Sequence, residues 1–169
     1  MQDISLTSLF IALLVLMFLS GCFSASETAM MAVNRYRLRH LAAKKHRGAQ
    51  RTAELLERPD RLIGLLLVGN NTVNNSAVSI ATLIGLQLMG DGGAATATLI
   101  ATIFLLLFSE IIPKTFAALR PERIAIPSSY VLQPMMKVFY PIVVWPLNAL
   151  ANSIMRLFGF DPEKAARLH

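Results

Sequence analysis

Oxygen-bearing side chains occur four residues apart in stretches of this sequence that are otherwise apolar. Ser20 and Ser24 form one such pair, Asn70 and Asn74 form another, and Glu110 stands in a third stretch. Residues four apart lie on the same face of a helix, so each pair can present its oxygens in one direction. A carboxylate that converges with hydroxyl and amide oxygens suits a hard cation such as Mg²⁺, Ca²⁺ or Na⁺. The pattern therefore predicts an all-oxygen cation site that includes Glu110.

Two simpler interpretations stay open at this point. Asn71 and Asn75 are also four apart, so a neighbouring face of the same segment carries amides as well. Serine and asparagine side chains commonly hydrogen-bond between packed transmembrane helices. Glycines that would allow such helices to approach closely are Gly64, Gly69 and Gly85. Glu110, for its part, lies one helical turn from Lys114, and the simpler interpretation of its charge is an ion pair with that lysine.

Pro113 follows Glu110 by three residues and predicts a break in this helix. Proline has no backbone N–H and clashes with the preceding turn, so carbonyl oxygens near Ser109 and Glu110 would be freed to complete the coordination of a cation. Gly21 and Gly69 would loosen the other two segments in the same way. We therefore expect backbone oxygens beside the carboxylate.

The thiol and imidazole groups of the sequence do not favour a zinc or copper site. Cys22 is the only cysteine, and His40, His46 and His169 fall outside the apolar runs. Cys22 also closes the tetrapeptide LSGC, which fits a lipoprotein cleavage site that would remove residues 1–21. The chain opens on Met-Gln-Asp without the positive start of a signal peptide, so cleavage is the less favoured alternative.

The elements that position these residues are predicted from composition and hydropathy. The 169-residue chain is 54% hydrophobic and only 15% charged, with a mean hydropathy of +0.54, which is typical of a membrane protein. Uncharged runs cover residues 4–26, 62–90 and 92–109, and roughly 20 apolar residues suffice to cross a bilayer. We predict an all-α integral membrane domain with three broken transmembrane helices, each of which contributes one polar stretch.

The distribution of charge orients these segments in an inner or plasma membrane. Nine of the sixteen Lys and Arg residues lie between Arg35 and Arg61, whereas the turn at residues 89–93 has none. By the positive-inside rule, the basic segment is cytoplasmic and the turn is outside, which places the N-terminus outside and the C-terminus in the cytoplasm. The predicted partner of the basic segment is anionic lipid and not nucleic acid, because base-stacking aromatics are not interleaved with the charges.

Amphipathic patterns flank the predicted spans. Apolar residues within the basic segment favour helices that lie along the inner membrane surface, with a solvated basic helix as the alternative; these residues are Leu38, Leu41, Leu55 and Leu56. Glu27 is expected near the inner boundary, where it can meet water or an arginine. Four prolines interrupt residues 124–155, and Arg123 and Arg156 at its two ends both favour the cytoplasm. We predict a re-entrant or surface-lying helical pair there, and not a fourth crossing.

Three polar motifs follow one another along the chain: SGCFSASETA at residues 20–29, GNNTVN at residues 69–74 and SEIIPKT at residues 109–115. Together they resemble the signature stretches of the transmembrane domain of the CNNM/CorB/CorC magnesium transporter family. The stretches at residues 34–40 and 58–62 add bacterial CorB-like character, and the resemblance covers nearly the whole chain. Ala25 stands where bacterial relatives often have glycine, which affects only the local backbone.

The resemblance implies a fold, a cargo and partners. It implies a homodimer with an inward-facing Mg²⁺ site between three spans of each subunit, and Mg²⁺ transport by alternating access, usually efflux and in some members coupled to Na⁺ influx. The implied ligands are Ser20, Ser24, Asn70, Asn74 and Glu110. Residues 1–160 would form the transmembrane domain, and residues 161–169 would begin a connector to cytoplasmic CBS modules, which bind nucleotide in this family.

The sequence favours transport over catalysis. It contains no phosphate-binding glycine loop, nucleophile triad or metalloprotease helix, so we expect a protein that is not an enzyme. The competing hypothesis is a membrane Mg²⁺ sensor or scaffold that regulates another transporter through cytoplasmic modules. Transport is preferred because polar clusters occupy all three predicted spans, whereas a sensor can bind its ion at a surface.

Overall fold

A computed structural model describes residues 5–160 of the chain, and throughout this range the regular structure is helical, with no strand. The elements in order are α1 (Leu6–Ala32), α2 (Arg35–Ala43), α3 (Arg47–Leu56), α4 (Pro59–Met89), α5 (Asp91–Leu105), the π-helix η1 (Leu106–Ile111), α6 (Ile112–Leu119), α7 (Pro121–Phe139), the π-helix η2 (Tyr140–Val144) and α8 (Trp145–Leu157). The predicted all-α membrane class is confirmed. The first four residues and the expected connector at residues 161–169 lie outside the described part.

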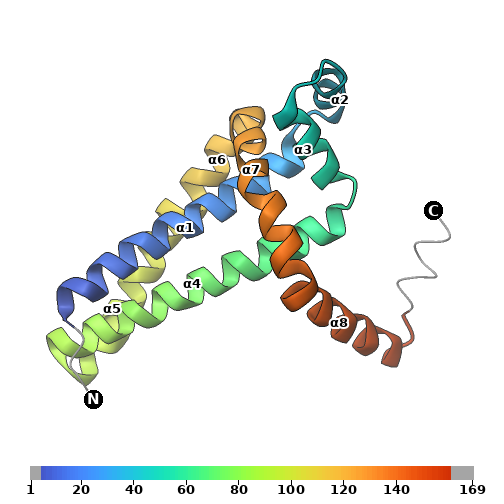
Figure 1. The fold of residues 1–169 in the computed structure, drawn as a ribbon. Helices are drawn as coiled ribbons and strands as arrows, with labels where there is room; N and C mark the ends of the chain where they lie inside the picture. Colours follow the sequence, from blue (N-terminus) through green and yellow to red (C-terminus); the bar gives the residue numbers. More distant parts are fainter. Residues whose placement is uncertain (1–4, 161–169) are drawn as a thin grey trace.

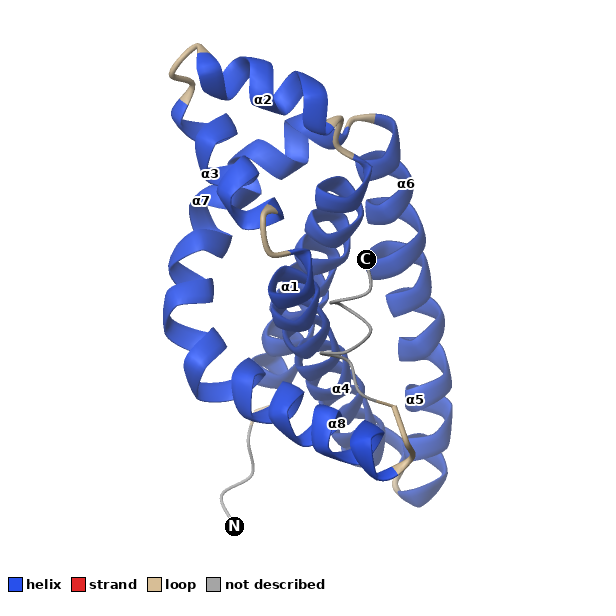
Figure 2. Ribbon diagram, turned by 90° about the vertical axis from the view of Figure 1, so that its right-hand side faces the viewer, coloured by secondary structure: helices blue, strands red, loops and turns tan. Residues whose placement is uncertain are grey.

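Three long rods, α1, α4 and the continuous run α5–η1–α6, lie side by side and form the body of the molecule (Figures 1 and 2). Within the described residues, three helical stretches are both long and apolar enough to cross a membrane: Leu6–Ala32, Asp91–Leu119 and Pro121–Leu157. The 31-residue α4 is long enough but carries four asparagines, which lower its hydropathy. The contacts of α4 with both α1 and α5 favour a crossing beside them. That α4 crosses the membrane stays our prediction.

The C-terminal part forms a bent arm. In Figure 1, α7 leaves the end of α6, crosses the bundle and meets α8, which projects away from it. Pro127 and Pro134 lie inside α7 without ending it, whereas η2 contains Pro141 and marks the bend into α8. No residue of α8 is buried. The expected helical pair is therefore present, but it bends at the π-helix and is not cut at each proline.

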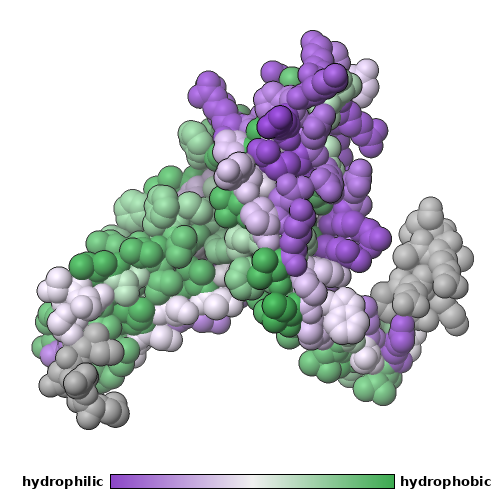
Figure 3. Space-filling model, viewed as in Figure 1, coloured by the Kyte–Doolittle hydropathy of each residue, from purple (hydrophilic) through white to green (hydrophobic). Residues whose placement is uncertain are grey.

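The apolar core of the described residues gathers at the basic end of the bundle, where α1, α3, the start of α4 and α7 meet. Leu38, Leu55 and Leu56 belong to this core. These leucines pack against protein, where α2 contacts α3 and α3 contacts α7, and the position of α2 and α3 along the inner membrane surface stays a prediction. The charged side chains of α2 and α3 point outward and form the hydrophilic cap in Figure 3, while the bundle below it is mainly hydrophobic.

Glycines bring α4 and α5 into close contact at the opposite end. Gly90 has a φ of 70°, a left-handed conformation that suits glycine, and it forms the predicted turn between these helices. The backbones of Gly85 and Gly93 then approach so closely that a Cβ on either residue would collide with the carbonyl oxygen of the other. The predicted role of Gly85 in close helix packing is confirmed.

Candidate cation site

The structure brings the five predicted ligand residues together between three helices. Ser20 and Ser24 lie one turn apart on α1 and are fully buried. Asn70 and Asn74 lie one turn apart on the facing side of α4, and Asn70 is only 8% exposed. Glu110 approaches from the π-helix η1. The two pairs of residues spaced four apart in the sequence thus face each other across α1 and α4, and the Glu110 carboxylate lies beside them.

Hydrogen bonds connect all five side chains. The Ser20 hydroxyl donates to the amide oxygen of Asn74 and lies 3.3 Å from that of Asn70. The Ser24 hydroxyl lies 3.5 Å from Asn70 Oδ1 and 3.3 Å from Glu110 Oε1. The amide nitrogens of Asn70 and Asn74 both donate to Glu110 Oε1 at 3.4 Å. Every polar group of the cluster therefore has a partner from another helix.

Glu110 also forms the ion pair that the sequence suggested as an alternative. Lys114 Nζ lies 3.0 Å from Glu110 Oε2, while Oε1 takes the three donors from α1 and α4. The side chain of Glu110 is 24% exposed and that of Lys114 is 43% exposed. The two interpretations of Glu110 are thus compatible, since each uses a different carboxylate oxygen.

The helix that carries Glu110 does not break at Pro113, and this prediction is wrong. Residues 106–111 widen into a π-helix, in which the N–H of Ile112 bonds to the carbonyl of Leu107, and α6 continues through Pro113. Such a turn accommodates proline because the carbonyl opposite the missing N–H is displaced, and π-turns are frequent at functional sites. The irregularity is therefore a widened turn at Glu110.

Contacts with α1 hold this π-turn in place. The Ser109 hydroxyl, fully buried, donates to the carbonyl oxygen of Met17 at 3.0 Å. A Cβ on Gly21 would lie 3.4 Å from Pro113 Cγ and 3.5 Å from the carbonyl oxygen of Phe108. The sequence pattern places Ser109 near the site but does not predict its hydrogen bond to Met17. The available signal was a serine directly beside the acid in an apolar run.

Gly21 and Gly69 do not loosen their helices, contrary to expectation. Both α1 and α4 run as uninterrupted α-helices past these positions. Gly69 instead makes room for Phe23, since a Cβ there would lie 2.7 Å from the ring. The two glycines permit α1 to approach its neighbours, so their effect is on packing and not on backbone regularity.

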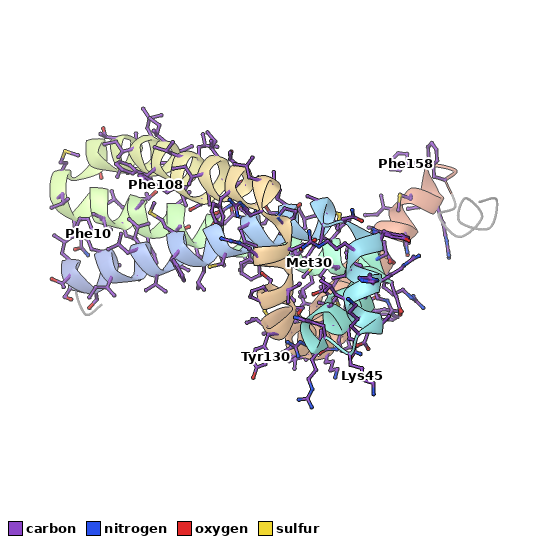
Figure 4. All side chains as sticks on the ribbon, turned by 90° about the horizontal axis from the view of Figure 1, so that it is seen from above. Phe10, Met30, Lys45, Phe108, Tyr130 and Phe158 are labelled. Atoms are coloured by element: carbon purple, nitrogen blue, oxygen red, sulfur yellow. The ribbon has the colours of Figure 1, made fainter. Side chains whose placement is uncertain are left out.

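Other candidate residues lie elsewhere. Asn71 and Asn75 are exposed on the outer side of α4, and Glu27 is partly buried. His46 caps α3 by accepting the N–H of Ala49 at 3.1 Å, while His169 lies outside the described residues. Figure 4 shows Phe10 and Met30 at opposite ends of α1, with Lys45 beyond Met30 at the basic end. No group of three His, Cys, Asp or Glu side chains gathers anywhere between residues 5 and 160.

The oxygen spacing can be compared with that of a metal coordination shell. Adjacent ligands in an octahedron are separated by about 1.4 metal–oxygen distances, which is about 2.9 Å for Mg²⁺ and about 3.4 Å for Ca²⁺. In the cluster, Ser20 Oγ and Asn70 Oδ1 are 3.3 Å apart, and Ser24 Oγ lies 3.3 Å from Glu110 Oε1. These two separations lie closer to the edge of a Ca²⁺ octahedron than to that of a Mg²⁺ octahedron, whereas Ser20 and Asn74 lie nearer to each other than either edge.

Comparisons with known proteins agree with the architecture. The family model described as the cyclin M transmembrane N-terminal domain (CNNM) matches residues 10–169. The inner membrane protein YfjD of Escherichia coli K12, a UPF0053 protein, is 48% identical over 145 residues, which cover 86% of this chain and 34% of the relative. A UPF0053 protein of Haemophilus influenzae is 45% identical over 159 residues, covering 94% of this chain and 38% of the relative.

More distant relatives carry a functional name. A polyamine export protein of Haemophilus influenzae is 29% identical over 161 residues, which cover 88% of this chain and 37% of that protein. The chain thus spans about a third of the length of the relatives it matches. Both the family model and the relatives describe membrane proteins. The chain therefore belongs to the CNNM family as its transmembrane domain.

Proposed function

We propose that this domain carries Mg²⁺ across the membrane and holds the ion, largely dehydrated, between α1, α4 and η1. The observation that carries the proposal is the convergence of hydroxyl and amide groups from α1 and α4 on one carboxylate oxygen of Glu110. Ionisable residues inside membrane bundles are costly and typically mark ion pathways. The five proposed ligands are Ser20, Ser24, Asn70, Asn74 and Glu110.

Binding exchanges one set of contacts for another. In the structure, the amide nitrogens of Asn70 and Asn74 donate to Glu110, and their oxygens accept from Ser20 and Ser24. Turning each amide about its terminal torsion presents oxygen to the ion in place of nitrogen. For Mg²⁺, the Ser24 hydroxyl oxygen and Glu110 Oε1, which lie 3.3 Å apart, must then close to about 2.9 Å. This movement draws η1 toward α1, which provides a means of coupling occupancy to helix position.

The transport cycle that we propose is alternating access, with Mg²⁺ efflux as the physiological direction and Na⁺ as a candidate coupling ion. The N-terminus faces the outside and the basic end formed by α2 and α3 faces the cytoplasm of a cell membrane. The basic residues between Arg35 and Arg61 would then meet anionic lipid headgroups. CBS modules that follow the connector would regulate the cycle in a longer chain.

We further propose that the domain functions as a homodimer. Asn71, Asn75 and Ser79 are exposed and lie four residues apart along the outer face of α4. Polar side chains at this depth require partners, because hydrocarbon supplies none. A second copy of α4 can supply the same groups in a symmetric contact. This arrangement would leave the cation site of each subunit on the opposite side of α4.

The central test replaces the carboxylate. Glu110→Gln keeps the shape but removes the charge, so we expect purified protein in liposomes to lose Mg²⁺ flux and Mg²⁺ binding by more than tenfold. The matched control is Glu122→Gln, because Glu122 forms an ion pair with Arg37 at 3.3 Å at the basic end. Unchanged flux and binding in Glu110→Gln would refute the assignment of the site.

The alternative of a Mg²⁺ sensor or scaffold uses the same residues. It is favoured if the reconstituted domain binds Mg²⁺ at Glu110 but moves none under any ion gradient. In that case contraction of the cluster would be the signal, passed to cytoplasmic modules. Flux measurement with an enclosed Mg²⁺ dye, run together with equilibrium binding on the same preparation, separates the two functions.

A second cargo is suggested by the relatives named polyamine export proteins, which are 29% and 28% identical to this chain. The supporting observation is that Glu110 already accepts a primary ammonium, that of Lys114, at 3.0 Å. An amine of a polyamine is chemically the same group. Competition decides between the cargoes: spermidine that displaces Mg²⁺ and is itself transported would favour polyamine export, whereas spermidine without effect would favour Mg²⁺.

A further inference from the structure

We propose that Lys114 competes with the cargo for Glu110. The lysine pairs with Glu110 when no cation is bound, and it thereby lowers the affinity of the site for any cation that must displace it. The inference rests on the proposed cation site and adds a residue that is not a ligand. It assigns Lys114 the role of setting the affinity of the site: its ammonium must leave Glu110 before the carboxylate can coordinate a cation with both oxygens.

The carboxylate of Glu110 is divided between two sets of partners. Its Oε1 accepts from Ser24, Asn70 and Asn74 at 3.3 to 3.4 Å, which is long for hydrogen bonds of this kind. Its Oε2 lies 3.0 Å from Lys114 Nζ, the shortest of these contacts and one between full charges. The lysine is thus the strongest partner of the carboxylate among these groups.

The location of Lys114 allows it to leave. Glu110 belongs to η1 and Lys114 to α6, with Pro113 between them, so the pair bridges the junction of the widened turn and the regular helix. The Lys114 side chain is 43% exposed, against 24% for Glu110, and a lysine reaches its partner through a flexible four-carbon stem. It can therefore swing outward, whereas the donors from α1 and α4 stay fixed in the bundle.

Charge balance explains why a divalent ion displaces the lysine more readily than a monovalent ion does. The pair of Glu110 and Lys114 has no net charge, and a monovalent ion that replaces the lysine leaves the site equally neutral. Such an ion gains nothing in charge over a partner that is already tethered beside the carboxylate at high effective concentration. A divalent ion interacts with the carboxylate twice as strongly at the same distance. Displacing the lysine costs the same free energy for either ion, so the lysine lowers both affinities by the same factor, and Mg²⁺, which has the larger attraction to the carboxylate, still binds.

The first experiment removes the competing charge. In Lys114→Met, we expect Mg²⁺ to bind about threefold to tenfold more tightly in isothermal titration of the purified protein, and Na⁺ to inhibit that binding more effectively than in the wild type. Lys114→Arg retains a competing cation and should show no gain. Lys137→Met, which removes an exposed lysine of α7, controls for net charge. Thermal unfolding verifies folding, and Lys114→Gln replaces the Met variant if that one is unfolded.

A second readout follows the lysine directly in the wild-type protein. Reductive methylation read by mass spectrometry should find Lys114 protected without Mg²⁺ and at least threefold more reactive at saturating Mg²⁺, with Lys137 unchanged. Equal or weaker Mg²⁺ binding in Lys114→Met, or Mg²⁺-independent labelling, would overturn the competitor role and leave the cation site intact. If the wild type binds no Mg²⁺, then the proposed function and this inference both fail.

Discussion

The two asparagine pairs of α4 have the same residue type and the same spacing, yet they meet opposite surroundings. Asn70 and Asn74 face α1 and η1, where their amides bond to serine hydroxyls and to Glu110. Asn71 and Asn75, each the next residue along, are exposed on the outer side of the same helix. A helix advances by about 100° per residue, so this single step moves an amide from a filled polar cluster to the outer surface.

The difference shows that polar residues in a membrane helix do not share one explanation. The inner pair has partners within the subunit, so its amides incur little cost there and are available to a cation. The outer pair lacks neighbours from α1 and η1 and needs a partner from elsewhere, since hydrocarbon offers no hydrogen bonds. We therefore propose that the inner face binds the cation and that the outer face mediates association, and substitutions can test each proposal separately.

The largest effect is expected when the inner face is changed. Asn74→Leu removes one of the five proposed ligand oxygens, and leucine offers no oxygen with which a hard cation could replace it. Mg²⁺ affinity, measured by titration calorimetry, should fall about tenfold or more. Asn75→Leu is the matched control and should change affinity less than twofold. Equal losses in both variants would remove the distinction between the faces.

A smaller effect is expected on the outer face. The double variant Asn71→Leu/Asn75→Leu should weaken dimerisation in bilayers by about 1 kcal/mol, because interhelical hydrogen bonds contribute about 0.6 kcal/mol each on average. Resonance energy transfer between labelled copies, diluted with lipid, measures the dissociation constant. Leu14→Ala on the exposed side of α1 serves as the control. An unchanged dissociation constant in the double variant would exclude this face of α4 from the dimer contact.

The smallest effect concerns a single hydroxyl of the inner cluster. Ser24 would supply one hydroxyl oxygen, which lies 3.3 Å from Glu110 Oε1, and a water molecule can replace a lost hydroxyl because Mg²⁺ usually keeps several waters. Ser24→Ala should therefore lower Mg²⁺ affinity about twofold to fivefold in the same calorimetric assay. Ser76→Ala should leave affinity unchanged, because Ser76 donates to the Thr72 carbonyl of its own helix at 2.8 Å. A larger loss of Mg²⁺ affinity in Ser76→Ala than in Ser24→Ala would contradict the proposed role of the inner cluster in Mg²⁺ binding.

Several features could be predicted from local pattern alone. The four-residue spacing of Ser20 with Ser24 and of Asn70 with Asn74 defines shared helix faces, and the glycine at 90 marks the reversal between α4 and α5. Other expectations failed where neighbours intervened. A π-turn at Glu110 replaces the expected break, and the Ser109 hydroxyl ties this turn to the Met17 carbonyl of α1; a sequence contains no direct signal of such a contact.

At the basic end of the molecule, too, local pattern predicted an apolar face but not what covers it. The amphipathic pattern of Leu38, Leu55 and Leu56 correctly predicted an apolar face, but an apolar face can bury itself against lipid or against protein. The structure places it against protein, since α7 lies across α3 and belongs to the same core. Composition could not decide between these environments because both remove apolar surface from water at similar gain.

The sequence by itself determined that the chain forms apolar helices interrupted by a small number of oxygen-bearing positions, because hydropathy and helical period are properties of neighbouring residues. The tertiary structure decided which of these oxygens meet. Glu110 lies 36 residues beyond Asn74 and 86 beyond Ser24, so their contact depends on how far each helix is rotated toward the others. That rotation follows from packing at Gly21, Gly69 and the η1 turn, where close fit over many atoms selects one arrangement.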